Sequence, residues 1–389
     1  MNSTYWDMIQ LLFSICMKVK IIKLSSDAFW KIKEIKKMNI LQVCAYAAKY
    51  GGNFIASLMA LEEDLKKKGH NVSYLFPESA RKYRWCKDIE KEHQVFYCGI
   101  NRFSVKTFLK IRYAMKNMDI VHSHFELYDM LVSLAAKKNQ RIVWHLHDSF
   151  DENLDYVHRI INKLQYRMLS KNILLVSPNE YYTNYVVKLG FPEKNIRLAE
   201  NCIDLTRLKQ TKKSTACYDF LVFGGFYYIK GLDILLDACR ILKSQNKEFL
   251  VGIVGYHDTW EWINMNYSDV KSKLYLIEPT EQIVILYNST KVFLSTSRRE
   301  CFSYALLEAL SLGKPVIVSD IPGNSWASKY ETVFKFENEN AEELARRMTY
   351  FIENNYEIDN ELLSNTGKEV RERYSIDNWI LKIEEVYFE

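Results

Sequence analysis

Short apolar runs alternate along the chain with longer segments whose apolar residues recur every three or four positions. An apolar run at residues 40–45 leads into a glycine turn, a helical pattern covers 54–68, and a second run follows at 72–76. Continuous apolar runs are typical of parallel strands buried on both faces, and the longer periodicity is typical of a helix with one buried stripe. The order strand, glycine turn, helix, strand therefore predicts a βαβ unit of the Rossmann type.

The same alternation continues to the end of the chain and predicts a second α/β domain. A polar segment at 209–217 separates two groups of strands and is the expected linker. A length of 389 residues is sufficient for two domains with a core each. Further strands are expected at 119–124, 141–148, 174–177, 220–223, 249–255, 273–277, 292–294 and 316–318.

Composition narrows the class of protein. Hydrophobic residues make up 48% of the chain and charged residues 26%, which is typical of a soluble globular protein. The formal net charge of +5 is too small to indicate nucleic acid, and it suits an anionic nucleotide or a membrane surface. Eight cysteines without a CxxC pair or a metal-like spacing favour a reduced, cytoplasmic protein. No stretch approaches the ~20 apolar residues that span a bilayer.

Two basic segments could contact the inner face of a membrane. In residues 1–37, an apolar run at 8–17 precedes a series of lysines, an order that argues against a signal peptide. This N-terminal extension is either a basic helix on anionic lipid or a weakly ordered segment before the domain that begins at Met38. Residues 103–118 could likewise form a basic amphipathic helix on lipid, or an ordinary surface helix with a solvated face.

Two carboxylates, Glu300 and Glu308, lie on either side of a predicted helix start. Ser303 is a suitable N-cap for a helix over 304–312, and Gly313 is a suitable residue to end it. The free N–H groups and the positive dipole end of such a helix favour phosphate, and nearby carboxylates can accept hydrogen bonds from sugar hydroxyls. On the spacing alone, the more frequent case is that Glu300 is a solvated loop residue and Glu308 an exposed helix residue.

Four histidines stand at the ends of two predicted neighbouring strands. His122 and His124 close one apolar run, and His145 and His147 close the next. Open α/β sheets bind ligands at the carboxyl ends of their strands. A single histidine there would more often be structural, but four at one edge favour a functional role.

Residues 295–320 resemble the donor-binding signature of the retaining GT-B glycosyltransferases of glycosyltransferase family 4. The usual pattern is S-x-x-E-G-F-G-x-x-x-L-E-A-M-A-x-G-x-P-V-I-x-S-D. The chain follows it without a gap, with Cys301 and Ser303 where the family usually has glycines. The residues in register are Ser297, Glu300, Phe302, Leu307, Glu308, Ala309, Gly313, Pro315, Val316, Ile317, Ser319 and Asp320.

Elsewhere the resemblance is partial. Lys230 ends a segment similar to the family's G-R-x-x-x-x-K-G, but Gly225 stands where the arginine that grips the donor pyrophosphate is expected. Lys230, the helix dipole, and Arg298 or Arg299 could compensate for the missing charge, or the loss could mark weak or altered donor binding.

In the first half of the chain, Gly51 and Gly52 match the Gly-Gly loop that opens the first domain's side of the cleft. His147 matches the histidine of a T-x-H-D ending that faces the transferred sugar, with His145 in the threonine's place.

The resemblance also implies the domain limits. Residues 201–204 are similar to the family's Asn-Gly-Ile-Asp at the crossing between domains, with Cys202 replacing the glycine. We therefore expect an α/β fold of the GT-B type, with two Rossmann-like domains facing each other across a cleft. The first is an acceptor domain at 38–203, and the second is a nucleotide-sugar donor domain at 204–370. The closing helix at 371–389 is expected to pack back on the first.

The resemblance implies that the protein transfers a sugar, with retention, from a UDP- or GDP-linked donor to a glycan or lipid-linked acceptor. It also implies a role in cell-surface polysaccharide synthesis, in the cytoplasm or at the inner face of the membrane. Glu308 would hold the ribose and Glu300 the hydroxyls of the donor sugar. Lys230 and the N–H groups near Phe302 and Ser303 would stabilise the leaving diphosphate. His147 would lie on the acceptor side. No protein nucleophile, cofactor or metal is expected, and the chain has no Asp-x-Asp motif.

Two alternatives remain open at this stage. Gly225, and Trp326 near a position where the family often has glutamate, would fit a non-catalytic GT-B subunit that binds sugar or a partner protein. A sugar-nucleotide epimerase or a phosphorylase with the same fold fits less well, because the Glu-x7-Glu stretch is closer to the transferases.

Overall fold

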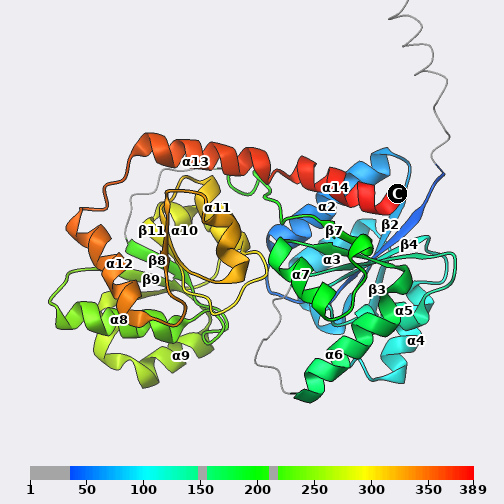
Figure 1. The fold of residues 1–389 in the computed structure, drawn as a ribbon, viewed down its shortest axis with the longest axis horizontal. Helices are drawn as coiled ribbons and strands as arrows, with labels where there is room; N and C mark the ends of the chain where they lie inside the picture. Colours follow the sequence, from blue (N-terminus) through cyan, green and yellow to red (C-terminus); the bar gives the residue numbers. More distant parts are fainter. Residues whose placement is uncertain (1–35, 148–155, 210–217) are drawn as a thin grey trace, which may run out of the picture.

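The computed structural model describes residues 36–147, 156–209 and 218–389. These residues form two α/β units, each built on a parallel sheet (Figure 1). The prediction of two Rossmann-like domains is confirmed. Residues 1–35 of the expected extension and 210–217 of the expected linker lie outside the described residues.

The first sheet has the strand order β3-β2-β1-β4-β5-β6-β7, and all neighbouring strands pair in parallel. The order reverses between β1 and β4, and ligands of such sheets bind outside the carboxyl ends of the strands at this point. The strands are β1 (Asn39–Cys44), β2 (Asn71–Pro77), β3 (Val95–Cys98), β4 (Ile120–His124), β5 (Arg141–His145), β6 (Ile173–Ser177) and β7 (Ile196–Leu198). The helices are α2 (Gly52–Lys67), α3 (Arg84–Glu92), α4 (Val105–Ala114), α5 (Asp129–Ala135), α6 (Tyr156–Leu169) and α7 (Glu180–Lys188).

The second sheet repeats this plan in the order β10-β9-β8-β11-β12-β13, again with parallel pairs. Its switch point lies between β8 and β11. The strands are β8 (Tyr218–Phe223), β9 (Val251–Val254), β10 (Leu274–Ile277), β11 (Thr290–Ser295), β12 (Val316–Ser319) and β13 (Val333–Phe336). The helices are α8 (Leu232–Ser244), α9 (His257–Asn266), α10 (Ile283–Asn288), α11 (Tyr304–Ser311) and α12 (Ala341–Glu353).

The last two helices join the units. α13 (Asn360–Arg373) lies along the second unit, and α14 (Ile376–Phe388) lies over the first (Figure 1). Trp379 and Tyr387 of α14 are buried with Ile40 of β1 and Leu61 of α2. The Arg141 guanidinium donates hydrogen bonds to the carbonyls of Val386 and Tyr387, at 3.0 and 2.8 Å. The end of the chain therefore forms part of the first unit's core.

The basic segment at 103–118 forms the short helix α4. Ser104 caps it by accepting a hydrogen bond from the Thr107 N–H, and the helix ends at Ala114. Large apolar side chains are exposed on α4 and just before it, namely Phe103, Val105, Leu109 and Tyr113. Within the part of the chain that the structure describes, no helix combines the length and the apolar character needed to cross a bilayer.

Candidate active site

The loop between β11 and α11 is the centre of the candidate site. Ser303 caps α11 by accepting a hydrogen bond from the Leu306 N–H at 3.4 Å, and Gly313 follows the helix end in a left-handed conformation with φ +68°. The helix ends at Ser311, one residue earlier than predicted. The first N–H groups of any helix have no acceptor within the helix, so the start of α11 is suited to an anion.

Lys230 and Glu300, 70 residues apart in sequence, meet beside this helix start. The Lys230 ammonium lies 2.6 Å from Glu300 Oε1, and the Ser297 hydroxyl donates to the same oxygen at 2.7 Å. The side chains are 31% and 15% exposed, so the pair still reaches the surface. Glu300 is therefore held in place by two partners and is not a freely solvated loop residue.

The loop that carries Lys230 is fixed on the end of β11. The Thr296 hydroxyl donates to the Lys230 carbonyl at 2.8 Å. Gly231 has φ +60°, and a Cβ at this position would lie 2.0 Å from the Thr296 carbonyl oxygen. Only glycine fits this contact, so Gly231 fixes the position of the neighbouring ammonium.

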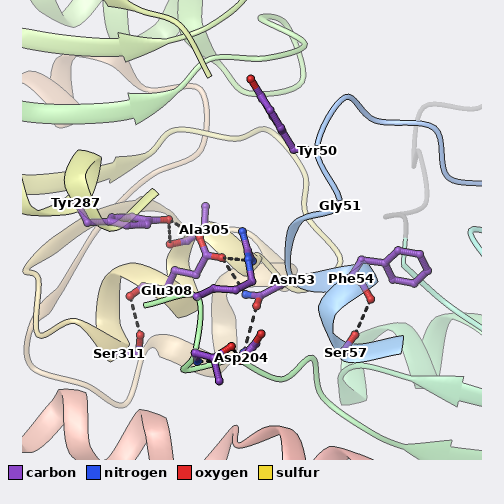
Figure 2. A network of polar contacts seen from close by, with 12 residues as sticks. Tyr50, Gly51, Asn53, Phe54, Ser57, Asp204, Tyr287, Ala305, Glu308 and Ser311 are labelled. Atoms are coloured by element: carbon purple, nitrogen blue, oxygen red, sulfur yellow. Dashed lines mark hydrogen bonds and ion pairs between the residues drawn. The ribbon is translucent and has the colours of Figure 1, made fainter. Parts of the chain in front are cut away.

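Glu308 is buried, and three side chains contact its carboxylate (Figure 2). Tyr287 of α10 donates to Oε2 at 2.9 Å, Asn53 of α2 donates to Oε1 at 2.9 Å, and Arg207 lies 3.3 Å from Oε1. Burial raises the pKa of Glu308, and Arg207 and Tyr287 act in the opposite direction. The alternative of an exposed helix residue is therefore wrong.

The glycine turn of the first unit lies against this network (Figure 2). α2 begins at Gly52, two residues earlier than predicted, and Gly51 immediately precedes it. The Tyr50 hydroxyl donates to the Pro279 carbonyl of the second unit at 2.9 Å. Asn53, next after the glycines, contacts Glu308 and also accepts a hydrogen bond from the Asp204 N–H at 3.2 Å. Gly51 and Gly52 thus lie where the two units meet.

Side chains of the first unit also donate hydrogen bonds to three consecutive backbone carbonyls in the loop before α11. Tyr182 donates to the Glu300 carbonyl at 2.9 Å, Asn179 to that of Cys301 at 2.7 Å, and Asn201 to that of Phe302 at 2.9 Å. The Cys301 side chain is buried within the first unit's core. The candidate site is therefore built by both units.

Trp326 has a packing role. Its ring stacks on Phe302, with centroids 4.6 Å apart and planes within 9°, and it also contacts Tyr374. This contact supports the backbone before α11, so the residue that suggested a non-catalytic subunit is explained by packing.

Gly225 has open space around it. A Cβ added there would meet no heavy atom within 4 Å among the described residues. Crowding therefore does not explain the missing arginine. Arg298 binds both oxygens of Asp233, at 2.8 and 2.7 Å, and also contacts Glu339 at 2.6 Å. The Arg298 guanidinium is therefore already engaged by two carboxylates, and compensation for the missing arginine stays a prediction.

The four predicted histidines gather at the carboxyl ends of β4 and β5. His122 and His124 have ring centroids 4.0 Å apart, and His145 and His147 4.2 Å apart. His147 Nε2 lies 3.0 Å from His124 Nδ1, and its ring also packs on Phe125. Burial lowers the pKa of all four rings, that of His145 to about 3, so they are neutral near pH 7.

Several site residues were missed by the sequence analysis. Tyr287 lies in the short, mostly apolar helix α10, Asn179 lies just before α7 and Tyr182 lies within it, and no local pattern marks these residues. Asn53 follows the glycine pair, and Arg207 follows the domain-crossing motif. For these two residues, the position next to a recognised motif was the only feature of the sequence that could have indicated a role in the site.

Comparison with known proteins gives consistent matches for both units. A model described as glycosyl transferases group 1 matches residues 206–373, and one described as glycosyltransferase family 4 matches residues 56–207. The O-antigen biosynthesis glycosyltransferase WclY of Escherichia coli is 24% identical over 73% of this chain and 81% of its own. The capsular polysaccharide biosynthesis glycosyltransferase CapH of Staphylococcus aureus is 27% identical over 63% of this chain and 72% of its own.

Solved structures agree on the fold. Anabaena Alr3699/HepE in complex with UDP-glucose superposes with a TM-score of 0.73 at 15% identity, over 90% of this chain and 99% of its own. Sucrose-phosphate synthase from Thermosynechococcus elongatus gives a TM-score of 0.70 at 16% identity, over 90% and 98% of the two chains.

Proposed function

Because the chain belongs to the GT-B glycosyltransferases of family 4, we propose that it moves a sugar from a UDP- or GDP-linked donor to a glycan or lipid-linked acceptor, with retention of anomeric configuration. The observation that carries this proposal is the Lys230–Glu300 pair at the start of α11. A cation, a carboxylate and a helix amino terminus meet there. A sugar diphosphate presents the complementary groups, namely phosphate oxygens beside hydroxyls.

In the proposed complex the diphosphate lies at the start of α11. The N–H groups near Phe302 and Ser303 and the Lys230 ammonium stabilise the charge that develops on the leaving group. Lys230 and Ser297 both contact Glu300 Oε1, so Oε2 is the oxygen that we assign to the hydroxyls of the donor sugar. We also assign the backbone of Gly225 to the diphosphate, a contact that needs no side chain.

Glu308 is assigned to the ribose. A carboxylate offers about four lone-pair sites, and Asn53, Arg207 and Tyr287 use three of them. Binding both ribose hydroxyls therefore requires one protein contact to be released. Asn53 is the partner that comes from the first unit, and we assign the released contact to it.

The proposed transfer takes place on one face of the sugar. The acceptor hydroxyl approaches C1 on the side from which the phosphate departs. The new C1–oxygen bond forms as the C1–phosphate oxygen bond breaks, and a phosphate oxygen takes the hydroxyl proton. His147 is assigned to the acceptor side of the sugar. The step itself requires no protein nucleophile and no metal.

The acceptor is proposed to be a cell-surface polysaccharide precursor at the cytoplasmic face of the membrane. The names of WclY and CapH support a role in polysaccharide synthesis. Contact with anionic lipid is supported by α4, where exposed Leu109 and Tyr113 lie beside Lys106 and Arg112. Leu109→Glu should reduce co-sedimentation with anionic vesicles, whereas Leu381→Glu, at an exposed leucine of α14, should not. Equal co-sedimentation of both variants would contradict the lipid contact.

The main test is transfer by the purified chain across UDP- and GDP-sugars, with binding of UDP and GDP measured in parallel. Lys230→Ala and Glu308→Ala should each lower transfer by roughly 100-fold or more, with an unchanged circular dichroism spectrum. Lys247→Ala is the matched control, since this lysine pairs with exposed Glu353. Near-normal transfer by both site variants would refute the assignment, and the absence of nucleotide binding would favour a non-catalytic subunit.

A further inference from the structure

The histidine cluster contains buried ring nitrogens that no described residue satisfies. His124 and His145 are opposite each other in the register of β4 and β5, and His122 lies two residues before His124 on the same face. Within the described parts of the chain, His122 Nε2, both nitrogens of His145 and His147 Nδ1 have no hydrogen-bond partner. A buried polar atom without a partner loses the hydrogen bonds that it would make to water in the unfolded chain. Several such atoms at one place indicate a missing ligand.

We propose that His122, His124 and His145 bind a divalent transition-metal ion. One nitrogen from each ring lies within 4.8 Å of the others. Zinc–nitrogen bonds are roughly 2.0–2.1 Å long, so two nitrogens on one tetrahedral ion lie about 3.4 Å apart. Ring rotations about the side-chain bonds close this difference. Imidazole ligands suit zinc, copper or nickel, whereas magnesium and calcium prefer oxygen.

Gln42 and Tyr387 contact the ring nitrogens of His124 and His122 that would not bind the ion, and so act as outer-sphere partners. The Gln42 amide oxygen lies 2.9 Å from His124 Nε2 and can only accept, so Nε2 carries the proton and Nδ1 keeps its lone pair. The Tyr387 hydroxyl lies 2.7 Å from His122 Nδ1 and accepts a hydrogen bond from Gln42 at 2.9 Å. Metal-binding histidines commonly use their second nitrogen in this way.

His147 is the nearest group for a fourth ligand. Its Nε2 lies 3.0 Å from His124 Nδ1, the atom that faces the ion in this arrangement. A tetrahedral zinc site has four ligands. His147 or a water molecule completes the set, and the ion joins the ends of β4 and β5 next to the ring that we assign to the acceptor side.

His145 makes this cluster unusual, because it stands where the family pattern has threonine. Replacing His145 by threonine therefore removes one ligand and restores the residue of that pattern. The proposal does not depend on sugar transfer, because metal binding is measured without donor or acceptor. Its failure leaves the donor site untouched.

The test uses the untagged full chain, stripped with a chelator and then titrated with zinc chloride. We expect about one zinc ion per chain, and a loss of affinity of roughly 100-fold or more in His145→Thr, since even outer-sphere partners contribute 10- to 100-fold. His257→Ala, in the exposed part of α9, is the matched control and should bind as the wild type does. No bound zinc in the wild type, or equal affinity in His145→Thr, would overturn the proposal.

A second measurement avoids reliance on any variant. X-ray absorption at the zinc edge of the wild-type protein should show nitrogen ligands at roughly 2.0–2.1 Å with the scattering of several imidazole rings. A shell containing sulfur, or oxygen without imidazole, would place the ion elsewhere and overturn the assignment.

Discussion

The donor side of the second unit and the histidine cluster of the first unit differ in whether their polar side chains have hydrogen-bond partners. Glu300 and Glu308 have two and three side-chain partners, and Lys230 is paired with Glu300. His145 is buried with both ring nitrogens unpaired among the described residues. The first arrangement is preorganised for charge that arrives on a ligand. The second arrangement leaves ring nitrogens that a bound ligand could pair with.

This difference has a physical origin in how each region is built. The donor side is assembled from loops and helix ends, and first-unit side chains hold the backbone of the loop before α11. Lys230 and Ser297 of the second unit pair with Glu300, and Asn53 of the first unit reaches Glu308. The histidines stand in strands, where backbone pairing fixes the side chains in register and leaves little freedom to find partners. Substitutions can therefore be chosen that change the paired charged groups of the donor side and leave the buried polar groups of the first unit unchanged, or the reverse.

The largest expected effect is at Gly231, which fixes Lys230. In Gly231→Ala the new Cβ conflicts with the Thr296 carbonyl oxygen, 2.0 Å away, and must displace the loop. Because the displaced ammonium no longer faces the leaving group, we expect turnover to fall by roughly 100- to 1,000-fold. Transfer rates at saturating donor would measure the change.

Gly225→Ala is the matched control in the same loop, because its Cβ meets open space. Its turnover should remain within about threefold of the wild type. Equal losses in the two variants would show that preorganisation of Lys230 is not what the loop provides.

A second prediction concerns a buried carboxyl group of the first unit, Asp129 of α5, on whose pKa Ser123 has a lowering effect smaller than that of burial. Its Oδ1 has no partner among the described residues, and burial raises its pKa to about 7. The folded protein therefore holds this proton more tightly than the unfolded chain, whose Asp pKa is about 3.9. The stability that protonated Asp129 contributes is complete below about pH 4 and is lost as the pH rises to about 7, at about 1.4 kcal/mol per pH unit.

Denaturant unfolding of the wild type and Asp129→Asn across this range would measure the effect. The difference in unfolding free energy between the two proteins should shift in favour of the variant between pH 4 and 7 and stay constant above it. Asp88→Asn, at an exposed carboxylate of α3 paired with Lys91, should show little change over the upper part of this range. A pH-independent difference for Asp129→Asn would mean that this carboxyl is satisfied in the folded protein.

The sequence predicted the fold well because its evidence is local. Apolar runs, the glycine turn and the Ser303 cap each depend on residues close together in the chain, and most strands and helices formed within a few residues of their expected limits. The pairing of Lys230 with Glu300 was also within reach, since both lie in segments that resemble one family.

Contacts between the units were outside the reach of local patterns. Asn179, Tyr182 and Asn201 hold carbonyls more than a hundred residues away, and such contacts depend on how two finished domains dock. The burial of Glu308 by Asn53 has the same origin. The ion pair between Arg298 and Asp233 was not predicted, because the two residues are far apart in the sequence and no local pattern links them.

A third prediction adds a charge to the donor side at Gly225. A Cβ at this position meets no described heavy atom within 4 Å, so a longer side chain starts in open space. A guanidinium there would add a charge-assisted contact to phosphate, worth about 1.5–3 kcal/mol. We expect Gly225→Arg to bind UDP or GDP roughly tenfold more tightly by calorimetry. Unchanged affinity would indicate that the diphosphate does not lie beside this loop.

The smallest expected effect tests whether the junction competes with the donor. Asn53 contributes one neutral side-chain hydrogen bond to Glu308 from the first unit, and our assignment requires it to leave when ribose binds. Such a bond has a net value of about 1 kcal/mol. Asn53→Ala should therefore raise nucleoside diphosphate affinity by about fivefold, while Asn71→Ala, at an exposed asparagine of β2, leaves it unchanged. Weaker binding in Asn53→Ala would instead mean that Asn53 orients Glu308 for the ribose.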